Sequence, residues 1–457
     1  MFKKILIANR GEIAVRIIRA AREMGISTVA IYSEADKESL HTILADEAIC
    51  VGPAKSAESY LNVNAILSAA IVTGAEAVHP GFGFLSENSK FATMCEEMNL
   101  KFIGPSGEVM DKMGDKINAR AEMIKADVPV IPGSDGQVTS VEEAVSIAEE
   151  IGYPLMLKAS AGGGGKGIRK VKSADELKPA FESASQEALA AFGNGAMYIE
   201  KVIYPARHIE VQILGDSFGK IVHLGERDCS LQRNNQKVLE ESPSVAIGNT
   251  LRQQIGEAAV RAAEAVSYEN AGTIEFLLDE NSGQFYFMEM NTRVQVEHPV
   301  TEFVTGVDIV KEQIRIAAGI PLSVSQNDIK LTGHAIECRI NAENPQFNFA
   351  PCPGTINGLL HLPAGGMGLR VDSAVYTGYT IPPYYDSMIA KVIVHGENRF
   401  DALMKMQRAL YELEIDGIVT NTEFQMDLIS DKKVLAGDYD TSFLMEDFLP
   451  RYYGNNQ

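Results

Sequence analysis

The sequence predicts a multidomain protein that combines α/β and α+β architecture, and three observations support this. Residues 1–113 alternate short apolar strands with amphipathic helices, which indicates a parallel sheet with helices on both faces. A run of four glycines, residues 162–165, lies between two short predicted strands. Two further predicted strands, 272–279 and 285–299, carry acidic and amide side chains on one face. The 457 residues suffice for two or three domains.

Composition narrows the class of protein. Apolar residues make up 46% of the chain, and no run is long enough to cross a membrane. The chain starts like a signal peptide, but Arg10 and Glu12 interrupt the apolar run that would have to follow. The five cysteines are odd in number and show no paired spacing, which favours a reduced, cytoplasmic setting. A net charge of -20 argues against a nucleic-acid-binding surface. We therefore expect a cytoplasmic protein that binds neither nucleic acid nor a membrane.

The first 113 residues divide into four predicted strands and three predicted helices. The strands are 4–8, 28–32, 77–79 and 102–103, and the helices are 12–24, 61–73 and 90–98. The segment NRGE, residues 9–12, follows the first strand but has a single glycine, so it is not a dinucleotide-binding fingerprint. The segment HPGFGFLSEN, residues 79–88, follows a strand at the edge where open α/β sheets bind ligands. Its residue types are equally compatible with a structural turn.

The next block, from residue 114 to about 205, combines lysines with glycines. Lys116 precedes a predicted helix, a position compatible with a nucleotide contact or with a surface lysine in a first turn. Lys158 ends a predicted strand, and the glycines that follow lack a Cβ, so the backbone can approach a phosphate closely. Lys166 is followed by Gly167 rather than by Ser or Thr, which excludes a P-loop. A linker is the alternative, but the lysines on both sides of the glycines favour a flap over phosphates.

A predicted strand over residues 207–214 presents His208, Glu210 and Gln212 on one face. His208 is either a structural histidine or a contact on the phosphate side of a nucleotide, and the neighbouring acidic strands favour the contact. Beyond it, residues 226–237 are predicted to form a polar loop, in which Lys237 is the outstanding cation.

The segment 285–299, FYFMEMNTRVQVEHP, carries the densest chemistry of the chain. Read as a strand with period two, one face is wholly polar and consists of Glu289, Asn291, Arg293, Gln295 and Glu297. An ordinary half-buried strand would present Lys, Thr and Ser to solvent instead. Within this set, the run from Arg293 to Glu297 predicts a site with a base and an oxyanion clamp.

A hairpin brings two acidic residues face to face. The turn NSG connects strand 272–279 to the polar strand, and pairing Glu280 with Gln284 places Glu275 directly opposite Glu289. Like charges that face each other across a sheet are destabilising, so this pair calls for a bound cation. Asn291 lies one step further along, about 7 Å away by strand rise. Two carboxylates and an amide oxygen suit Mg²⁺ that also holds nucleotide phosphates.

The third block, about 330–446, is mixed. Its predicted elements are strands 333–341 and 387–395, a turn at 350–354 and a helix at 399–413. The first of these strands carries Glu337 and Arg339 on one parity.

Together these features resemble the ATP-grasp fold and, more narrowly, the biotin carboxylases. The segments that carry the resemblance are NRGEIA (9–14), HPGFGFLSEN (79–88), ERDCS (226–230), EMNTRVQVEHPVTE (289–302), ECRINAE (337–343) and YYDSM (384–388). The resemblance covers almost the whole chain. It implies a Rossmann-like N-terminal domain over 1–113, an ATP-grasp domain over 114–320 with a mobile glycine-rich lid of about 131–203, and a mixed C-terminal domain over 321–457.

The resemblance also implies an activity, the carboxylation of biotin by ATP and bicarbonate through carboxyphosphate, with Mg²⁺ or Mn²⁺ as cofactor. The implied ATP contacts are Lys116, Lys158, Gly164, Gly165, Glu200, Lys201, Val202, Ile203, His208, Gln232, Asn235, Glu275 and Glu289. The implied metal ligands are Glu275, Glu289 and Asn291. The implied bicarbonate contacts are Lys237, Arg293, Gln295, the backbone of Val296, and Glu297. Glu297 would be the base, and Arg339 would stabilise the enolate-like oxygen of biotin beside Phe82; the catalytic set is Arg293, Glu297, Lys237 and Arg339.

Some positions depart from the family pattern. Phe82 stands where many members have tyrosine, which removes a hydroxyl near biotin. Asn234 and Asn235 stand where many bacterial members have arginine and histidine. Lys166 replaces a common arginine, which keeps the charge but loses bidentate geometry. Lys405 lies between two methionines like a biotin-attachment lysine, but its helical context predicts that this chain carries no covalent biotin.

The resemblance implies partners as well. The chain looks like the separate carboxylase subunit of a bacterial acetyl-CoA carboxylase, which serves fatty acid synthesis with a biotin carboxyl carrier protein and a carboxyltransferase. Family members often dimerise through the region of Arg16, Arg19 and Glu23 and the block near 367–370, although a solvated helix face is the alternative. The same motifs are compatible with a subunit of another acyl-CoA or pyruvate carboxylase, with a different bicarbonate-activating ligase such as one that forms carbamoyl phosphate, and with a catalytically silent nucleotide-binding subunit.

Overall fold

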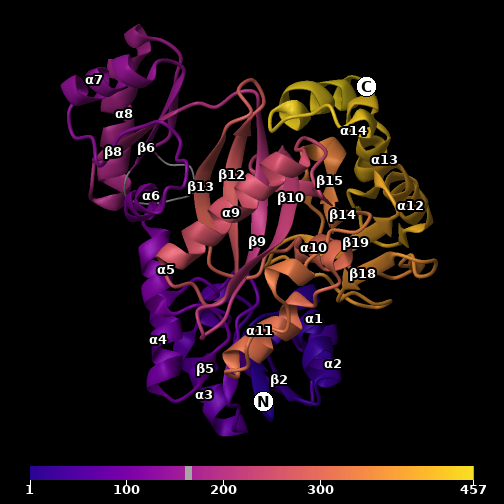
Figure 1. Ribbon diagram of the computed structural model, residues 1–457. Helices are drawn as coiled ribbons and strands as arrows, with labels where there is room; N and C mark the ends of the chain where they lie inside the picture. Colours follow the sequence, from indigo (N-terminus) through magenta and orange to yellow (C-terminus); the bar gives the residue numbers. More distant parts are fainter. Residues whose placement is uncertain (160–166, 456–457) are drawn as a thin grey trace.

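The computed structural model describes residues 1–159 and 167–455. The glycine run with Gly164 and Gly165, and the neighbouring Lys166, lie outside the described residues. Within the described ranges the chain forms an N-terminal unit, a unit that projects from the body, and a large sheet that continues into a C-terminal block (Figure 1).

The N-terminal unit is built on a parallel sheet with the strand order β3-β2-β1-β4-β5, as in Rossmann-like folds. Its strands are β1 (Lys4–Ile7), β2 (Ser27–Ser33), β3 (Glu47–Gly52), β4 (Ala77–His79) and β5 (Lys101–Phe102). Its helices are α1 (Gly11–Glu23), α2 (Leu40–Leu44), α3 (Val63–Thr73), α4 (Ser89–Glu97) and α5 (Gly107–Gly114). Ile5 and Ile7 enter one hydrophobic core and Leu6 and Ala8 another, because this strand is covered on both faces. The predicted parallel sheet is confirmed. Sequence analysis missed β3, an edge strand whose side chains are mostly exposed.

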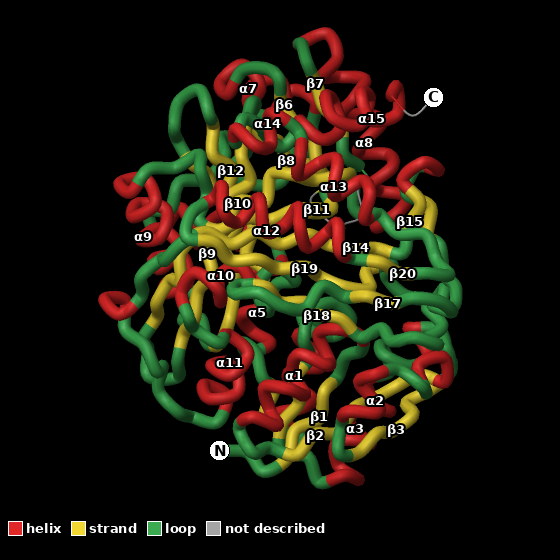
Figure 2. Tube along the Cα trace, turned by 90° about the vertical axis from the view of Figure 1, so that its right-hand side faces the viewer, coloured by secondary structure: helices red, strands yellow, loops and turns green. Residues whose placement is uncertain are grey.

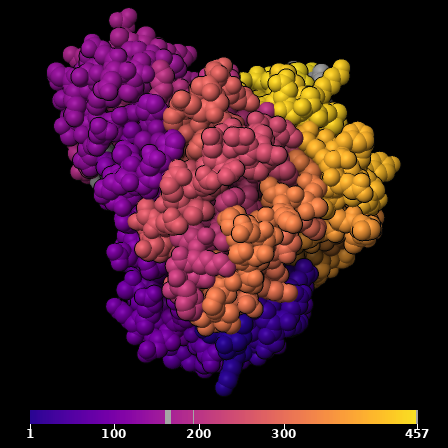
Figure 3. Space-filling view, in the orientation of Figure 1, coloured from indigo at the N-terminus to yellow at the C-terminus, as the bar shows by residue number. Residues whose placement is uncertain are grey.

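The projecting unit is a small antiparallel sheet covered by two helices. Its elements are β6 (Leu155–Ala159), β7 (Arg169–Val171), β8 (Met197–Lys201), α7 (Val141–Ile151) and α8 (Ala174–Phe192), and α6 (Lys116–Lys125) leads into it. Figures 1 and 3 show it standing out at the upper left of the molecule. The movement of this unit as a lid stays a prediction.

The largest sheet has eight strands in the order β13-β12-β9-β10-β11-β14-β19-β18. They are β9 (Ala206–Gly215), β10 (Ile221–Arg233), β11 (Gln236–Ser242), β12 (Asn270–Asp279), β13 (Phe285–Asn291), β14 (His334–Asn341), β18 (Leu369–Ser373) and β19 (Met388–Gly396). Helix α9 (Asn249–Ala265) packs on β9 and β10, and α10 (His298–Thr305) and α11 (Ile309–Ala317) follow β13. Since β11 pairs with β14, the central and C-terminal blocks share one sheet. The domain boundaries at 113 and 320 stay predictions.

The C-terminal block covers the far end of this sheet with helices. Its helices are α12 (Arg399–Glu412), α13 (Thr422–Ser430), α14 (Lys432–Ala436) and α15 (Leu449–Asn455). Its short strands are β15 (Glu343–Asn344), β16 (Ala350–Pro351), β17 (Leu360–His361) and β20 (Glu414–Ile415). Figure 2 shows α12 and α13 lying over the sheet. Lys405 lies inside α12, in the helical context that the sequence predicts. None of the described helices is both long and apolar enough to cross a membrane.

The prediction of a polar loop over residues 226–237 is wrong. This segment is the end of β10, a two-residue turn and the start of β11. The turn residues Asn234 and Asn235 have φ angles of 49° and 64°, and asparagine adopts this left-handed conformation more readily than most residues. The asparagine pair therefore forms the hairpin turn that carries Lys237 into a strand.

The prediction of one strand over residues 285–299 is correct only as far as Asn291. After it the chain leaves the sheet, and Pro299 lies in the first turn of α10, where a residue without an N–H fits. The register of the hairpin also differs near its turn: Leu278 is opposite Phe285. A β-bulge between Glu275 and Phe276 shifts the register by one residue.

A buried ion cluster ties β11 to the C-terminal block. Glu241 accepts hydrogen bonds from Tyr439, from His334 at 2.6 Å and from Arg399 at 2.7 Å. Burial raises the pKa of Glu241, but His334 and Arg399 outweigh it and lower that pKa to about 2. Because the carboxyl group has a pKa of about 4.3 in an unfolded chain, the cluster stabilises the folded state fully above that pH. This stabilisation is lost as the pH falls toward 2.

We predict that Glu241→Gln destabilises the protein by about 3 to 5 kcal/mol at pH 7, because the partly buried Arg399 then lacks its carboxylate. Thermal unfolding of wild type and variant between pH 7 and pH 3 tests this. The difference in Tm should be constant above about pH 5 and should narrow below it. A difference that does not change with pH would contradict the ionised cluster.

Candidate active site

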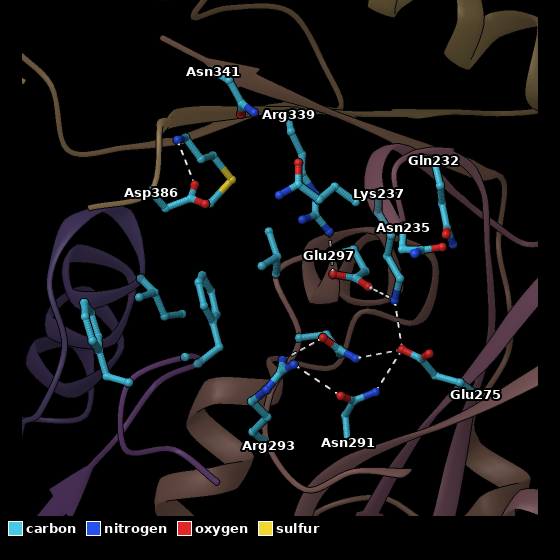
Figure 4. Close-up of a pocket in the computed structure, with 18 of the residues that line it drawn as sticks. Gln232, Asn235, Lys237, Glu275, Asn291, Arg293, Glu297, Arg339, Asn341 and Asp386 are labelled. Atoms are coloured by element: carbon cyan, nitrogen blue, oxygen red, sulfur yellow. Dashed lines mark hydrogen bonds and ion pairs between the residues drawn. The ribbon is translucent and has the colours of Figure 1, made fainter. Parts of the chain in front are cut away.

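A cavity of about 1040 Å³ lies where the N-terminal unit, the projecting unit and the large sheet meet. Most of the residues predicted for the site line it. They are Phe82, Lys116, Lys158, His208, Gln232, Asn235, Lys237, Glu275, Glu289, Asn291, Arg293, Gln295, Val296, Glu297 and Arg339. Figure 4 shows polar side chains that point toward one another from strands β11 to β14 and from the segment after β13, namely Lys237, Glu275, Asn291, Arg293, Glu297 and Arg339.

The acidic pair lies on the β12–β13 hairpin, and Glu275 is directly opposite Glu289, as the sequence predicts. The β-bulge restores this pairing, because Phe276 pairs with Phe287 and leaves Met288 without a partner residue on β12. As a result, consecutive residues Met288 and Glu289 both line the cavity. An ideal alternating strand would have turned one of them away.

The electrostatics of this pair suit a divalent cation. Burial and the charge of Glu275 raise the pKa of Glu289. Among the described residues, Glu289 has no hydrogen-bond or ion-pair partner. Asn291 donates from Nδ2 to Glu275 at 2.8 Å, and its amide oxygen accepts from Arg293 at 3.2 Å. Two carboxylates and an amide oxygen are the hard donors that Mg²⁺ takes, so Glu275, Glu289 and Asn291 fit such an ion.

Lys237 connects the acidic pair to the rest of the site. Its Nζ lies 2.5 Å from Glu210, 3.0 Å from Glu275 and 2.7 Å from Glu297. Burial alone would lower the pKa of Lys237, but Glu210, Glu297 and Glu275 raise it well above its usual value. The lysine is therefore a fixed positive charge, and it neutralises part of a group of three buried carboxylates.

Glu297 is fully buried and lies between cations. Besides Lys237, Arg339 of β14 donates to its second carboxylate oxygen at 3.0 Å. Burial raises the pKa of Glu297, but Lys237, Arg339 and Arg227 outweigh it, so that pKa lies well below the usual range. Arg339 also contacts Glu240 of β11, which holds the guanidinium in place. The pKa of an ionised carboxylate between two cations depends on how closely each cation contacts it. A ligand that takes over one of these contacts raises that pKa.

Arg293 occupies the other side of the cavity, although it lies beyond the end of β13. It donates to the side-chain oxygens of Gln295 at 2.7 Å, Asn291 at 3.2 Å and Glu87 at 2.8 Å. Gln295 in turn donates to Glu275 at 3.2 Å. Hydrogen bonds, rather than the strand alternation that the sequence suggests, therefore orient the predicted oxyanion clamp.

The predicted nucleotide contacts divide into two groups. Lys116 and Lys158 line the cavity, and Lys158 also bonds to Glu200 across the β6–β8 pair. His208 lines the cavity too and lies 3.1 Å from Glu275 and 2.9 Å from Gln232; its contact with a nucleotide stays a prediction. Burial lowers the pKa of His208, but Glu275 outweighs it and raises that pKa.

The second group lies at the end of β8 and directly after it. Glu200, Lys201, Val202 and Ile203 do not line the cavity described here. Lys201 donates to the carbonyl of Tyr153 and the N–H of Val202 to the carbonyl of Pro154, so these residues hold the segment beside β6.

The loop that carries Phe82 is held by the N-terminal strand. Asn9 donates from Nδ2 to the carbonyls of Pro80 and Phe82, both at 2.7 Å. Gly81 between them has a φ of +63°, and a Cβ there would lie 2.9 Å from Asn9 Nδ2. The sequence HPGFGF therefore forms a defined loop that places the Phe82 ring in the cavity.

Sequence analysis did not assign three acids that organise the site. Glu210 joins Lys237 to the buried Arg227, Glu240 holds Arg339, and Glu87 bonds to Arg293. The sequence does contain a signal for Glu210, because the strand alternation places it on the same polar face as His208 and Gln212. Nothing in the local pattern marks the other two, because their partners lie far away in the sequence.

Comparisons with known proteins agree with this geometry. Residues 1–110 match the family described as "Biotin carboxylase, N-terminal domain", residues 115–325 "Carbamoyl-phosphate synthase L chain, ATP binding domain", and residues 337–446 "Biotin carboxylase C-terminal domain". Biotin carboxylase 1 of Bacillus subtilis is 58% identical over 444 residues, which are 97% of this chain and 98% of that protein. The chain belongs to the biotin carboxylase family.

Solved structures of biotin carboxylases have the same fold. The biotin carboxylase–β,γ-ATP complex from Campylobacter jejuni superimposes with a TM-score of 0.92 at 51% identity, over 97% of this chain and 98% of that one. The biotin carboxylase domain dimer of the 2-oxoglutarate carboxylase from Hydrogenobacter thermophilus, in complex with MgADP, ADP and bicarbonate, also gives 0.92 at 51% identity, over 99% of both chains. The predicted fold class, family and enzyme class, an ATP-dependent carboxylase, are confirmed.

We predict that Glu289→Gln weakens the binding of MgADP by at least about tenfold, because one of two metal-binding carboxylates is lost. The affinity for ADP in EDTA should stay unchanged. Isothermal titration calorimetry with and without Mg²⁺ measures both values. Glu280→Gln, on the same hairpin but outside the cavity, should behave as wild type. An equal loss in the presence and absence of Mg²⁺ would show that Glu289 is not a metal ligand.

Proposed function

We propose that this protein carboxylates biotin with bicarbonate at the expense of ATP, with the residues of the cavity in the roles set out below. The observation that carries the proposal is the position of Glu297, a buried carboxylate held between Lys237 and Arg339 beside the acidic hairpin. A base between two cations suits a small anion that must lose a proton, and the neighbouring carboxylates suit the metal that accompanies a nucleotide.

Glu297 is the base that activates bicarbonate. A bicarbonate ion held by Lys237, Arg293, Gln295 and the backbone of Val296 draws Lys237 away from Glu297, and the pKa of Glu297 then rises toward the range of a useful base. The carboxylate takes the proton of bicarbonate, and a bicarbonate oxygen attacks the γ-phosphorus of ATP. The bond from that phosphorus to the bridging oxygen breaks, and ADP leaves.

The nucleotide lies between the large sheet and the projecting unit. Lys116, Lys158 and His208 face its phosphates, Gln232 and Asn235 lie beside it, and the segment from Glu200 to Ile203 completes the described part of its site. The resemblance to biotin carboxylases assigns Gly164 and Gly165, which lie outside the described residues, to the nucleotide as well. Glu275, Glu289 and Asn291 hold Mg²⁺, which neutralises phosphate charge and aligns the phosphate for attack. Mn²⁺ has the same preference for oxygen donors and can replace it. Because carboxyphosphate hydrolyses readily, the projecting unit has to close over it and exclude water.

Biotin occupies the side of the cavity next to Arg339 and Phe82. Carboxyphosphate breaks into CO₂ and phosphate, the phosphate takes the proton of the biotin ring nitrogen, and that nitrogen forms a bond to CO₂. The Arg339 guanidinium stabilises the negative charge that develops on the ureido oxygen as the proton leaves. In sum, ATP, bicarbonate and biotin give carboxybiotin, ADP and phosphate. The side chain of Phe82 is apolar and has no hydroxyl group. Arg339 therefore provides the polar contact to the ureido ring of biotin.

The biotin is carried on another protein. We place this chain in an acetyl-CoA carboxylase, with a biotin carboxyl carrier protein and a carboxyltransferase as partners, and we expect it to act in the cytoplasm in fatty acid synthesis. Carboxylases that serve pyruvate, 2-oxoglutarate or another acyl-CoA are the alternative, because the residues of the cavity contact biotin and not the final acceptor. A different bicarbonate-activating ligase would leave Arg339 and the loop of Phe82 without a role. A silent regulatory subunit would not need Glu297, Arg293 and the acidic hairpin together.

We predict that release of ADP from MgATP and bicarbonate is stimulated by free biotin and that Glu297→Gln lowers this rate about 10² to 10⁴-fold. The variant should bind MgADP like wild type, because Glu297 is a base and not a nucleotide contact. A coupled ADP assay and calorimetry measure both properties. Turnover that is indifferent to biotin in the wild type would instead indicate another bicarbonate-activating ligase.

We also propose a two-fold dimer. The two segments predicted for the interface meet on one surface, where Arg16, Arg19 and Glu23 of α1 and Arg370 of β18 line a shallow depression of about 380 Å³. Met367 beside it is 90% exposed, a large apolar side chain available for a partner. Arg16 is already paired with Glu302 and Asp308, so it orders the surface from within. Arg19 is therefore the better residue to probe in the interface.

We predict that Arg19→Glu shifts the protein toward monomer, because the reversed charge lies beside Glu23 and opposes a self-complementary contact. Light scattering as a function of concentration gives the mass of wild type and variant. Wild type should have the mass of a dimer at micromolar concentration. A wild-type monomer throughout this range would refute the dimer.

A further inference from the structure

A fully buried lysine, Lys391, lies behind the site and contacts its backbone. It is on β19, directly opposite Arg339 of β14 on one side and Asp372 of β18 on the other. Residues directly opposite one another in a sheet point to the same face, so Lys391 and Arg339 stand side by side. Lys391 donates from Nζ to the carbonyl of Val296 at 2.7 Å. Two neighbouring cations on this face of the sheet therefore contact consecutive residues of the same turn. Arg339 contacts the side chain of Glu297, and Lys391 contacts the carbonyl of the preceding residue, Val296.

The carbonyl of Val296 needs this donor because the chain around it provides none. Pro299, three residues on, has no N–H. Val300, four residues on, donates its N–H to the carbonyl of Glu297 at 3.3 Å. At the start of a helix, the N–H group three or four residues further along would donate to this carbonyl. Here neither N–H group is available. Lys391 therefore takes the place of a backbone donor and sets the orientation of the peptide that joins Val296 to Glu297.

Lys391 is itself held from two other parts of the chain. Glu12 of α1 lies 3.2 Å from its Nζ, and Asp372 lies 3.9 Å away. Asp372 is also paired with Arg370, whereas Lys391 is the only ion-pair partner of Glu12 in the part of the chain that the structure describes. Burial lowers the pKa of Lys391, but Glu12, Glu337 and Asp372 outweigh it and raise that pKa. The lysine thus stays charged although no part of it reaches solvent.

We infer that Lys391 is a positioning residue for bicarbonate activation: its ammonium group, anchored by Glu12 and Asp372, fixes the Val296–Glu297 peptide so that the backbone of Val296 and the carboxylate of Glu297 meet bicarbonate together. This inference rests on the function proposed above. It assigns a role in the reaction to a residue that does not touch substrate and that lies outside the cavity lining. It also makes the N-terminal helix α1, through Glu12, part of the support of the base.

The test is Lys391→Met, which keeps much of the apolar stem and removes the donor. We expect kcat/KM for bicarbonate to fall about 10 to 100-fold, the cost of a small misplacement of reacting groups. The dissociation constant for MgADP should stay within about twofold of wild type, because Lys391 does not contact the nucleotide side. Steady-state kinetics with varied bicarbonate and calorimetry with MgADP give the two quantities. A normal kcat/KM for bicarbonate in a folded variant overturns the inference, and so does an equal loss of MgADP affinity, which would indicate a structural role only.

A matched control and a second variant keep the test decisive. Lys405 of α12 also donates to a backbone carbonyl, that of His395 on the same strand as Lys391, at 2.9 Å, but it lies outside the cavity. Lys405→Met should therefore have wild-type kinetics. If Lys391→Met does not fold, Lys391→Met combined with Glu12→Gln removes the unpaired buried charge together with the donor, and the same criteria apply to it. A wild type without biotin-stimulated turnover would instead refute the proposed function, so the two failures are distinguishable.

Discussion

The site depends on one lysine that compensates three buried carboxylates. Glu210, Glu275 and Glu297 come from β9, from β12 and from the turn before α10, and Lys237 lies within 3.0 Å of all of them. Without it, three negative charges would face one another in a region that is largely shielded from water, where their repulsion is weakly screened. Arg227 and Arg339 add charge on either side. The cavity is thus lined by charges of opposite sign that largely compensate one another. A bound anion or cation changes which of these charges are paired.

In the proposed function Glu297 is the base although its carboxyl group has a low pKa, and this balance accounts for that. In a purely apolar pocket the pKa of Glu297 would be high, and the side chain would be protonated before bicarbonate arrived. Between Lys237 and Arg339 it is ionised from the start. The same cations are the natural partners of an incoming anion, so binding of that anion and activation of the base are coupled. In the acidic hairpin the pKa shift has the opposite sign. Burial and the charge of Glu275 raise the pKa of Glu289, and a cation bound between the two carboxylates would lower it.

The continuous sheet brings residues from separate parts of the chain to the same cavity. Because β11 pairs with β14, Arg339 and Lys391 of the C-terminal block reach the turn that follows β13 of the central block. Glu12 on α1 and Phe82 after β4 bring the N-terminal unit to the same cavity. The N-terminal unit, the central block and the C-terminal block therefore contribute to one site. The projecting unit, which has its own small core, brings Lys158 to the same cavity. The closure of the projecting unit over the nucleotide stays a prediction.

The sequence by itself determined the elements whose signals are local. Strand and helix periods predict the N-terminal sheet, and the short turn before Gln284 predicts a hairpin that sets Glu275 opposite Glu289. The motifs shared with biotin carboxylases indicate the family and the set of residues that line the cavity. Only the tertiary structure decided which charges compensate which, where β13 ends, and that Asn234 and Asn235 form a turn between two strands. It also decided that Glu240 contacts Arg339 and that Lys391 contacts the carbonyl of Val296. The physical reason is that these contacts join residues far apart in the sequence, and they depend on strand order and on a single-residue bulge, neither of which leaves a periodic trace in the chain.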